Sequence, residues 1–187
     1  LFIKVENKTF NKILQSDKYS NDLLMKQTLD FLHKNNLSLE DITEVLVNQG
    51  PGNFSGLRGA ISICKGICLA KNIKLFGYNT FLLSSVKFYG THESIYSFVK
   101  IREKYYMQKF NNKLIPHSKP ISVTQKEIFS KYKNEIKIIG SQYAKNAENE
   151  TLNKNNFNVV NLDYRQLEFL KKKNLLQKSP ISPIYLY

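Results

Sequence analysis

The chain has 187 residues, of which 42% are hydrophobic and 12% aromatic, with no tryptophan, 8 glycines and 5 prolines. This length and composition suit one domain or two small lobes with a hydrophobic core, and they exclude a collagen-like or disordered chain. Lysine and arginine number 28 against 15 acidic residues, giving a formal net charge of +13. Such a chain attracts polyanions, although an excess spread along the sequence is also what a solvated surface carries.

The apolar runs and the two cysteines indicate in which cellular compartment the protein works. The longest apolar runs, FLLSSV and SFVKI, are far shorter than the roughly 20 residues that a membrane-spanning helix needs. Cys64 and Cys68 lie four residues apart in a predicted helix, where a disulfide is geometrically awkward, and the start of the sequence does not resemble a signal peptide. We therefore expect a cytoplasmic protein with two buried thiols and no membrane association.

The first half of the chain combines a hairpin with a strand–helix–strand unit, which implies parallel pairing of the two strands. In chain order the predicted elements are a β-hairpin in residues 1–13, a helix over 20–34 with a wide apolar arc, a short turn capped by Ser38 and Asp41, a strand at 44–48, a helix over 55–71 ending at a left-handed Asn72, and a strand at 74–78.

The second half is richer in strands. Its predicted elements are a short helix from Thr80, two strands at 94–100 and 104–110 joined by a tight turn, a helix capped by Thr124 and Glu127, strands at 136–140 and 157–162, a helix from Asp163 to about Asn174, and an extended tail. We expect a boundary near residues 86–91, giving lobes over 1–88 and 89–187. Residues 163–187 are candidates to pack back on the first lobe.

A glycine-rich turn between strand and helix is the segment that could carry chemistry. Such a turn brings backbone N–H groups and a helix N-terminus to one place, which suits a phosphate. The spacing excludes a Walker loop, and a Rossmann fingerprint would need glycine where Ser55 stands. Two interpretations stay open: glycines that only allow close packing, with Ser55 as helix cap, or a phosphate-binding loop formed by Gly50, Pro51, Gly52, Phe54, Ser55 and Gly56.

The helix after this turn has two distinct faces. One face is an apolar stripe that should cover the sheet, comprising Leu57, Ala60, Ile61, Cys64 and Cys68. The other face carries small side chains that let a second helix approach closely, namely Gly59, Ser62, Ile63, Gly66 and Ala70. This face could pack against the helix at 20–34 inside the molecule, or the two helices could form a combined surface for a partner chain.

The segment GPGNFSGLRGAISICKGICLAKNIKLFGYNT closely resembles the signature of the TsaB (YeaZ) family. Weaker likeness extends to YSNDLLMKQTLDFLHKNNLSLEDI, IREKYYMQKF and SPIYLY, so the resemblance covers most of the chain. It implies an α/β fold of the actin-like ATPase (RNase H-like) type with two lobes. It also implies a role in forming threonylcarbamoyladenosine at adenosine 37 of tRNA.

The same resemblance implies a non-catalytic scaffold without catalytic residues, metal or cofactor. It would pair with a TsaD-like catalytic subunit, support a TsaE-like ATPase, contact tRNA at most indirectly and form a homodimer when alone. Pairing would use the helices of the first lobe. The expected interface residues are Leu23, Leu24, Gln27, Phe31, Arg58, Gly59, Ser62, Ile63, Lys65, Gly66 and Ala70. Leu57 also matches the family signature.

Departures from the family pattern leave other functions open. The family's first strand, ILAIDTS in typical form, does not precede Leu1, so we expect that strand to be missing from the sheet. Tyr19 and Ser20 stand at a family His-Ser pair, and Tyr187 stands at a final arginine. The alternative function is a nucleotide-binding, ATPase-like enzyme that uses the Gly50–Gly56 loop.

The histidines and the tyrosine-rich segment are the remaining candidates for metal binding, catalysis or RNA contact. His33, His92 and His117 are scattered, so the paired histidines that the catalytic relative uses for metal have no counterpart, and a catalytic role for Ser55 has no support. The aromatic and basic segment KYYMQKF either faces RNA or forms a half-buried hairpin with solvated lysines.

Overall fold

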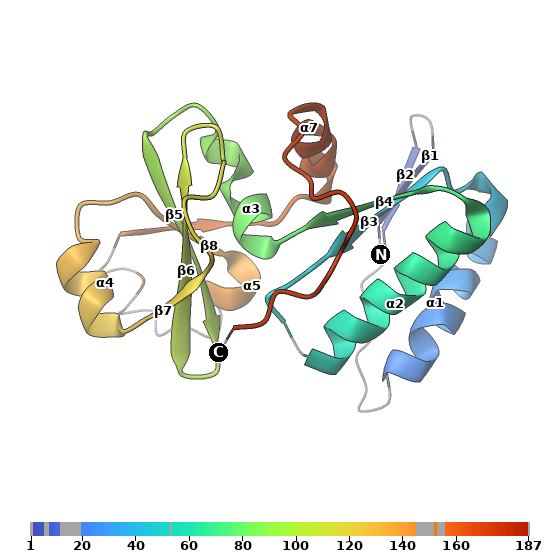
Figure 1. The fold of residues 1–187 in the computed structure, drawn as a ribbon, viewed down its shortest axis with the longest axis horizontal. Coiled ribbons are helices and arrows are strands. Elements are labelled where there is room, and N and C mark those ends of the chain that lie inside the picture. Colours follow the sequence, from blue (N-terminus) through green and yellow to red (C-terminus); the bar gives the residue numbers. More distant parts are fainter. Residues whose placement is uncertain are drawn as a thin grey trace. The chain divides into compact units, whose positions relative to one another are not determined.

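The computed structural model describes residues 2–5, 8–11, 20–52, 54–144, 152 and 156–186, and Figure 1 follows its course. The chain divides into two compact units, one of Leu1–Gly77 with Gln177–Pro183 and one of Tyr78–Leu176 with Ile184–Tyr187. The division falls before the region at 86–91 that the sequence indicated. The reason is that the helix α3 (Thr80–Ser85) packs against strands of the second unit.

The first unit begins with the predicted hairpin. Strands β1 (Phe2–Val5) and β2 (Lys8–Asn11) pair antiparallel. The helix α1 (Ser20–Lys34) and the turn η1 (Leu39–Asp41) follow, and Ser38 caps η1 with the predicted capping box. Local cap chemistry therefore sets the boundaries of these elements as expected.

The strand–helix–strand unit consists of β3 (Glu44–Asn48), α2 (Phe54–Lys71) and β4 (Lys74–Tyr78). The two strands are neighbours in one sheet, and their arrows run in the same direction in Figure 1. The apolar stripe of α2 covers this sheet: Ile61, 3% exposed, packs in one cluster with Val47 of β3. Because a parallel crossover needs its helix on one face of the sheet, this stripe fixes how α2 lies.

Both ends of α2 test the sequence prediction. Asn72 has the expected left-handed backbone, with φ of 50°, just after the last helical residue. Ser55 is the second residue of the helix, which begins at Phe54, so the prediction that Ser55 caps it is wrong. The cap position precedes the first helical residue, and Ser55 lies past that point.

The tail returns to the first unit as an extended segment. Gln177 and Gly77 exchange two backbone hydrogen bonds, each 2.8 Å, in an antiparallel bridge beside β4. Ile181, 1% exposed, completes the core cluster beneath α2. Residues 177–183 therefore pack with the first unit, whereas the rest of the predicted segment 163–187 belongs to the second unit.

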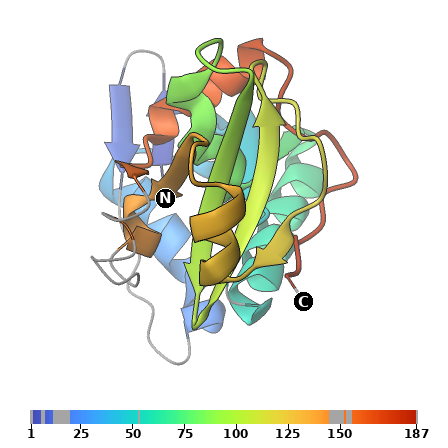
Figure 2. The same ribbon diagram turned by 90° about the vertical axis from the view of Figure 1, so that its left-hand side faces the viewer.

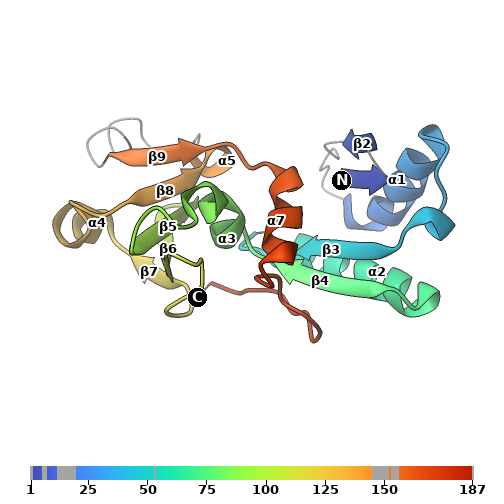
Figure 3. The ribbon, with the colours of Figure 1, turned by 90° about the horizontal axis from the view of Figure 1, so that it is seen from above.

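A five-stranded mixed sheet forms the second unit, in the order β7-β6-β5-β8-β9, which Figure 3 shows from above. β5 pairs antiparallel with β6 and parallel with β8, and β8 pairs parallel with β9. The strands are β5 (Ser94–Ile101), β6 (Lys104–Asn111), β7 (Ile121–Val123), β8 (Lys137–Gly140) and β9 (Phe157–Val160).

Helices cover both faces of this sheet. On one face Ile128 of α4 (Gln125–Lys131) is fully buried in a cluster with Phe98 of β5, and the gold α4 lies in front of the yellow-green strands in Figure 2. On the other face α3 is buried along its whole length, and its Ser84 hydroxyl lies 2.8 Å from the Ser97 hydroxyl of β5. The remaining helical elements are η2 (Val86–Phe88), α5 (Ser141–Ala144), η3 (Tyr164–Gln166) and α7 (Leu167–Lys172).

Candidate functional site

The exposed face of α2 is the most unusual surface of the first unit. α1 and α2 pack side by side (Figure 1), and the sheet-facing stripe of α2 is already covered by β3 and β4. Leu69 nevertheless projects outward, with 86% of its surface exposed. Burying a leucine side chain contributes about 1.5–3 kcal/mol. An isolated exposed leucine is ordinary, but its neighbours on this face matter.

The neighbours of Leu69 are small or flexible. Gly66 lies three residues before it on the same face, and a Cβ atom added at Gly66 would meet nothing within 4 Å. The exposed residues that share this outer face of α2 are Arg58, Ser62, Lys65, Gly66, Leu69 and Ala70. We call this set the α2 outer face. The small residues Ser62, Gly66 and Ala70 on this face give a second helix room to approach closely.

α1, which packs against α2, also carries exposed apolar side chains. Leu23 and Leu29 are 42% and 41% exposed, and Leu24 and Gln27 are half-buried. Phe31 does not lie on this surface, because its ring is 6% exposed and packs inside the unit. On a helix with apolar residues over a wide arc, the residue that turns inward is set by packing rather than by its position in the sequence.

The structure separates the predicted interface residues of α2 into two groups. Arg58, Ser62, Lys65, Gly66 and Ala70 lie on the α2 outer face, whereas Gly59 and Ile63 are half-buried. Leu69 lies on the same face of α2, and Leu29 is exposed on α1; neither residue was predicted. The spacing of Leu69 from Ser62 and Gly66 at helical intervals is the signal that could have found it.

The start of α2 contributes one more exposed ring. Phe54 is 55% exposed, and the Arg58 guanidinium lies over it, 5.2 Å from the ring centroid. This i, i+4 pair holds the arginine along the helix and presents a cationic, aromatic end to solvent. Phe54 was predicted as part of a phosphate loop, and the structure places its ring at the surface beside Arg58.

The glycine-rich loop offers fewer phosphate donors than its sequence indicates. Gly50 has a left-handed φ of 107°, and its N–H donates to Asn48 Oδ1 at 2.8 Å. Pro51 has no N–H to donate. Two consecutive positions of the loop thus hold no N–H directed to a ligand, whereas a phosphate cradle depends on successive backbone N–H groups.

Groups for metal or nucleophilic chemistry are sparse in the described residues. Among them, no three His, Cys, Asp or Glu side chains gather in a way that could hold a metal ion. Burial raises the pKa of the Cys64 thiol to about 11, with Cys68 adding to the shift, and burial also raises the pKa of Cys68. Both thiols are therefore protonated at neutral pH, and the thiolate is the form that ligates or attacks.

The tyrosines of KYYMQKF lie in the core of the second unit. Tyr105 and Tyr106 are 4% and 8% exposed, and Lys109 of the same strand lies over the Tyr96 ring, 5.3 Å from its centroid. Of the two interpretations of this segment, the half-buried hairpin is the one observed. These rings are not available to stack on RNA bases.

Comparison with known proteins identifies relatives. Residues 14–94 match the family model described as TsaD, tRNA N6-adenosine threonylcarbamoyltransferase. Over 184 residues the chain is 24% identical to the tRNA threonylcarbamoyladenosine biosynthesis protein TsaB of Buchnera aphidicola subsp. Baizongia pistaciae (strain Bp). The alignment covers 87% of this chain and 81% of that protein. Across the described residues, no helix has the length and apolar character needed to cross a membrane.

Two solved structures share the fold. A crystal structure of a Pseudomonas aeruginosa protein with similarity to the peptidase YeaZ matches 100% of this chain and 93% of its own, at a TM-score of 0.68 and 12% identity. YeaZ from Pseudomonas aeruginosa matches 99% of this chain and 92% of its own, with the same TM-score and identity. The fold is therefore the actin-like (RNase H-like) α/β fold expected from the sequence, and the chain is similar to proteins of the TsaB (YeaZ) family.

Proposed function

We propose that this chain is a cytoplasmic, non-catalytic scaffold subunit in the biosynthesis of threonylcarbamoyladenosine at adenosine 37 of tRNA. It pairs with a TsaD-type catalytic subunit through the α2 outer face and the exposed leucines of α1. A TsaE-type ATPase binds the resulting pair, and the isolated chain forms a homodimer through the same surface. The likeness to a TsaB protein of this pathway supports the assignment.

The observation that carries the proposal is that Leu69, 86% exposed, lies next to the open space over Gly66 on one face of α2. A partner helix could bury the large apolar side chain of Leu69 and approach closely over the glycine next to it. Leu23 and Leu29 are further exposed apolar side chains, on the neighbouring helix α1. Lys65 and Arg58 at its border suit acidic groups on the partner.

The alternative is a nucleotide-binding enzyme that uses the Gly50–Gly56 loop. The donor supply of that loop favours the scaffold, because the Gly50 N–H is committed to Asn48 and Pro51 has none. Calorimetric titration of the isolated chain with ATP and with ADP, each with Mg²⁺, separates the two functions. We expect no tight binding, and tight binding would favour the enzyme.

Two substitutions at Gly66 test the pairing directly. Gly66→Trp fills the open space and should abolish co-purification with a tagged TsaD-type subunit, while the circular dichroism spectrum of the chain stays unchanged. Gly66→Ala is the matched control, because it keeps the surface low and should co-purify normally. Co-purification of Gly66→Trp at wild-type stoichiometry would show that α2 does not form the interface.

A further inference from the structure

A basic and aromatic cluster in the second unit lies outside the α1 and α2 surface. It is built from three segments that are far apart in the sequence, residues 87–92, 111–113 and 165–173. The basic residues of these segments are Lys87, His92, Lys113, Arg165, Lys171, Lys172 and Lys173, all exposed. We call this set, with Tyr89 and Phe169, the α7 patch.

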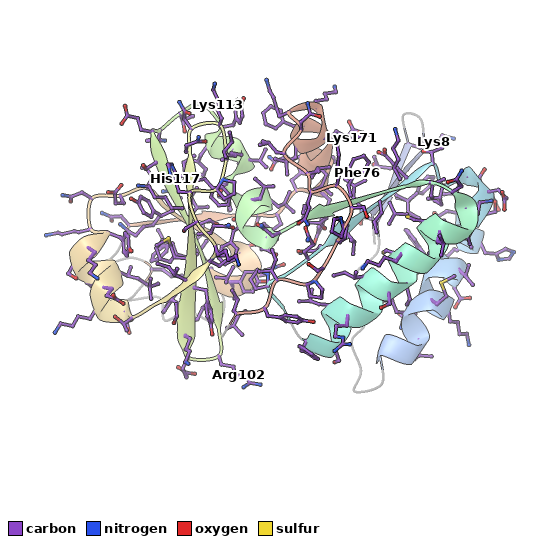
Figure 4. All side chains as sticks on the ribbon, viewed as in Figure 1. Lys8, Phe76, Arg102, Lys113, His117 and Lys171 are labelled. Atoms are coloured by element: carbon purple, nitrogen blue, oxygen red, sulfur yellow. The ribbon has the colours of Figure 1, made fainter. Side chains whose placement is uncertain are left out.

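Two contacts hold the three segments together. The Gly90 N–H donates to the Asn112 carbonyl at 2.8 Å, which joins the first segment to the second. The Tyr89 and Phe169 rings meet edge to face, 5.1 Å between centroids, which joins the first segment to α7. In Figure 4, Lys113 and Lys171 both lie in the upper part of the view of the second unit. These two contacts therefore bring the three segments together in one part of the unit.

Lysine and aromatic rings share one location in this patch. Lys173 Nζ lies 5.2 Å from the Tyr89 ring centroid and 5.8 Å from that of Phe169. The two rings are half-buried, so part of each reaches the surface. A positive charge held beside a partly exposed ring is the combination that recognises nucleic acid, since lysines contact phosphates and rings stack on bases.

Acidic groups of these segments reduce the positive field only in part. Asp163 accepts two hydrogen bonds from the Arg165 guanidinium, at 2.9 and 3.0 Å, and a third from the Arg165 backbone N–H. That pairing, with the nearby charge of Lys87 as a smaller cause, lowers the pKa of Asp163. Glu168 is exposed one helical turn before Lys171 and Lys172, and Lys173 follows the helix, so the three lysines outnumber this one carboxylate. The lysine end therefore presents net positive charge.

The apolar residues of α7 indicate which kind of polyanion fits. Leu167 and Leu170 are 7% and 0% exposed, so the apolar side of α7 is used inside the unit. A helix that binds a membrane surface keeps an apolar face to insert among the lipids. α7 has its lysines outward and its leucines inward, which suits a polyanion dissolved in water.

We propose that the α7 patch binds the phosphate backbone of RNA, with Tyr89 placed to contact a base. This surface acts separately from the pairing surface, and its test does not require a partner subunit. The contact would be direct, in contrast to the indirect tRNA contact expected from the sequence.

The experiment measures binding of the full chain to a fluorescein-labelled, unmodified tRNA transcript by fluorescence anisotropy over a series of salt concentrations. Lys171→Glu combined with Lys172→Glu should weaken binding by roughly tenfold or more. The same variant should reduce the slope of log affinity against log salt by about 2, since each phosphate contact contributes about 1 to that slope. Lys113→Glu alone, from a different segment, should reduce the slope by about 1.

The matched control is Lys119→Glu with Lys126→Glu, which reverses two exposed lysines of the same unit outside the patch. It carries the same net charge as the Lys171 and Lys172 variant, so an effect of overall charge would appear equally in both. We expect this control to bind like the wild type. Tyr89→Leu should lower affinity while leaving the salt slope unchanged, because a stacking contact releases no counterions.

Four results would overturn the proposal. The first is that the wild type does not bind the transcript, and the second is that the patch and control variants are weakened equally. The third is that neither patch variant binds the transcript more weakly than the wild type. The fourth is that the chain binds vesicles containing phosphatidylglycerol but not the transcript. Thermal melts of each variant, followed by circular dichroism, show whether it is folded. If the Lys171 and Lys172 variant fails to fold, Lys113→Glu decides the outcome.

Discussion

The side-chain amide of Gln49 donates to Gln177 Oε1 at 2.8 Å and also to the Ser182 carbonyl at 2.9 Å. Gln49 stands just after β3 and is 3% exposed, and Gln177 in turn donates to the Pro180 carbonyl at 2.8 Å. One buried amide thus fastens the returning tail to the end of a strand in the first unit. The tail also contributes Ile181 to the core cluster, so its position matters for packing.

Replacing Gln49 with leucine should therefore destabilise the first unit. The change keeps a side chain of similar size but removes the donor of two part-buried hydrogen bonds, a loss of about 1–3 kcal/mol. Urea unfolding followed by circular dichroism should show a lower midpoint, and proteolysis should cut residues 177–183 faster. Gln177→Ala, which keeps the bond to Ser182, should lose less. An unchanged midpoint for Gln49→Leu would show that this amide does not stabilise the tail.

Gly77 and Gly66 make a matched pair for substitution by alanine. A Cβ at Gly77 would lie 2.3 Å from Gln49 Oε1 and 2.9 Å from Ile181 Cδ1, whereas one at Gly66 would meet nothing within 4 Å. Gly77→Ala should therefore cost about 1–3 kcal/mol by overpacking the core. Gly66→Ala should stabilise by up to about 1 kcal/mol, because alanine favours the helix. Urea midpoints that move in the same direction for both variants would contradict this reasoning.

Local chemistry made much of this fold predictable. The capping boxes at Ser38 and Thr124 both form as the sequence indicated, because each needs only residues within one turn of chain. Two strand-like runs joined by a tight turn likewise predicted β5 and β6, which pair as an antiparallel hairpin. The TsaB signature then supplied the fold type, which short-range patterns alone do not specify.

Features that depend on distant residues were not predictable. The Gln49–Gln177 hydrogen bond joins positions 128 residues apart, so no local pattern announces it. The fully buried Lys137 is another case: its Nζ donates to the carbonyls of Tyr132, Lys133 and Glu135 near the end of α4. Lysine is almost never fully buried unless it is paired, so the sequence indicated surface there. In the candidate site, the inward turn of Phe31 and the outward turn of Leu69 were missed for the same reason, because tertiary packing decides them.

The capping box of α4 predicts an acid-dependent contribution to stability. The Thr124 backbone N–H donates to Glu127 Oε2 at 2.9 Å, and this bond, with those from Lys131 and the Thr124 hydroxyl, lowers the pKa of Glu127 from 4.5 to about 2. Because the folded pKa is the lower one, the stabilisation is fully present above pH 4.5 and is lost as the pH falls from 4.5 towards about 2.

Glu127→Gln should consequently be less stable than the wild type at neutral pH, with the difference shrinking as the pH falls through that window. Thermal melts of both proteins at neutral pH and in the middle of the window measure this. Thr124→Ala removes the same box from its other side and should show the same trend. An NMR titration of the Glu127 carboxyl with a midpoint near 4.5 would contradict the predicted pKa of about 2.

Leu69 offers the sharpest test of whether one surface serves both pairing modes of the proposed scaffold. Leu69→Asp places a carboxylate where a partner helix would bury an apolar side chain, so it should prevent homodimer formation by the isolated chain and reduce co-purification with a TsaD-type subunit. The monomer should keep its stability, because Leu69 is 86% exposed and contributes little to its core. Sedimentation velocity at several protein concentrations measures the first effect.

The control is Ile121→Asp on β7, where an apolar side chain 46% exposed lies in the other unit, and it should leave both assemblies intact. Loss of the homodimer with normal TsaD pairing would mean that the two assemblies use different surfaces.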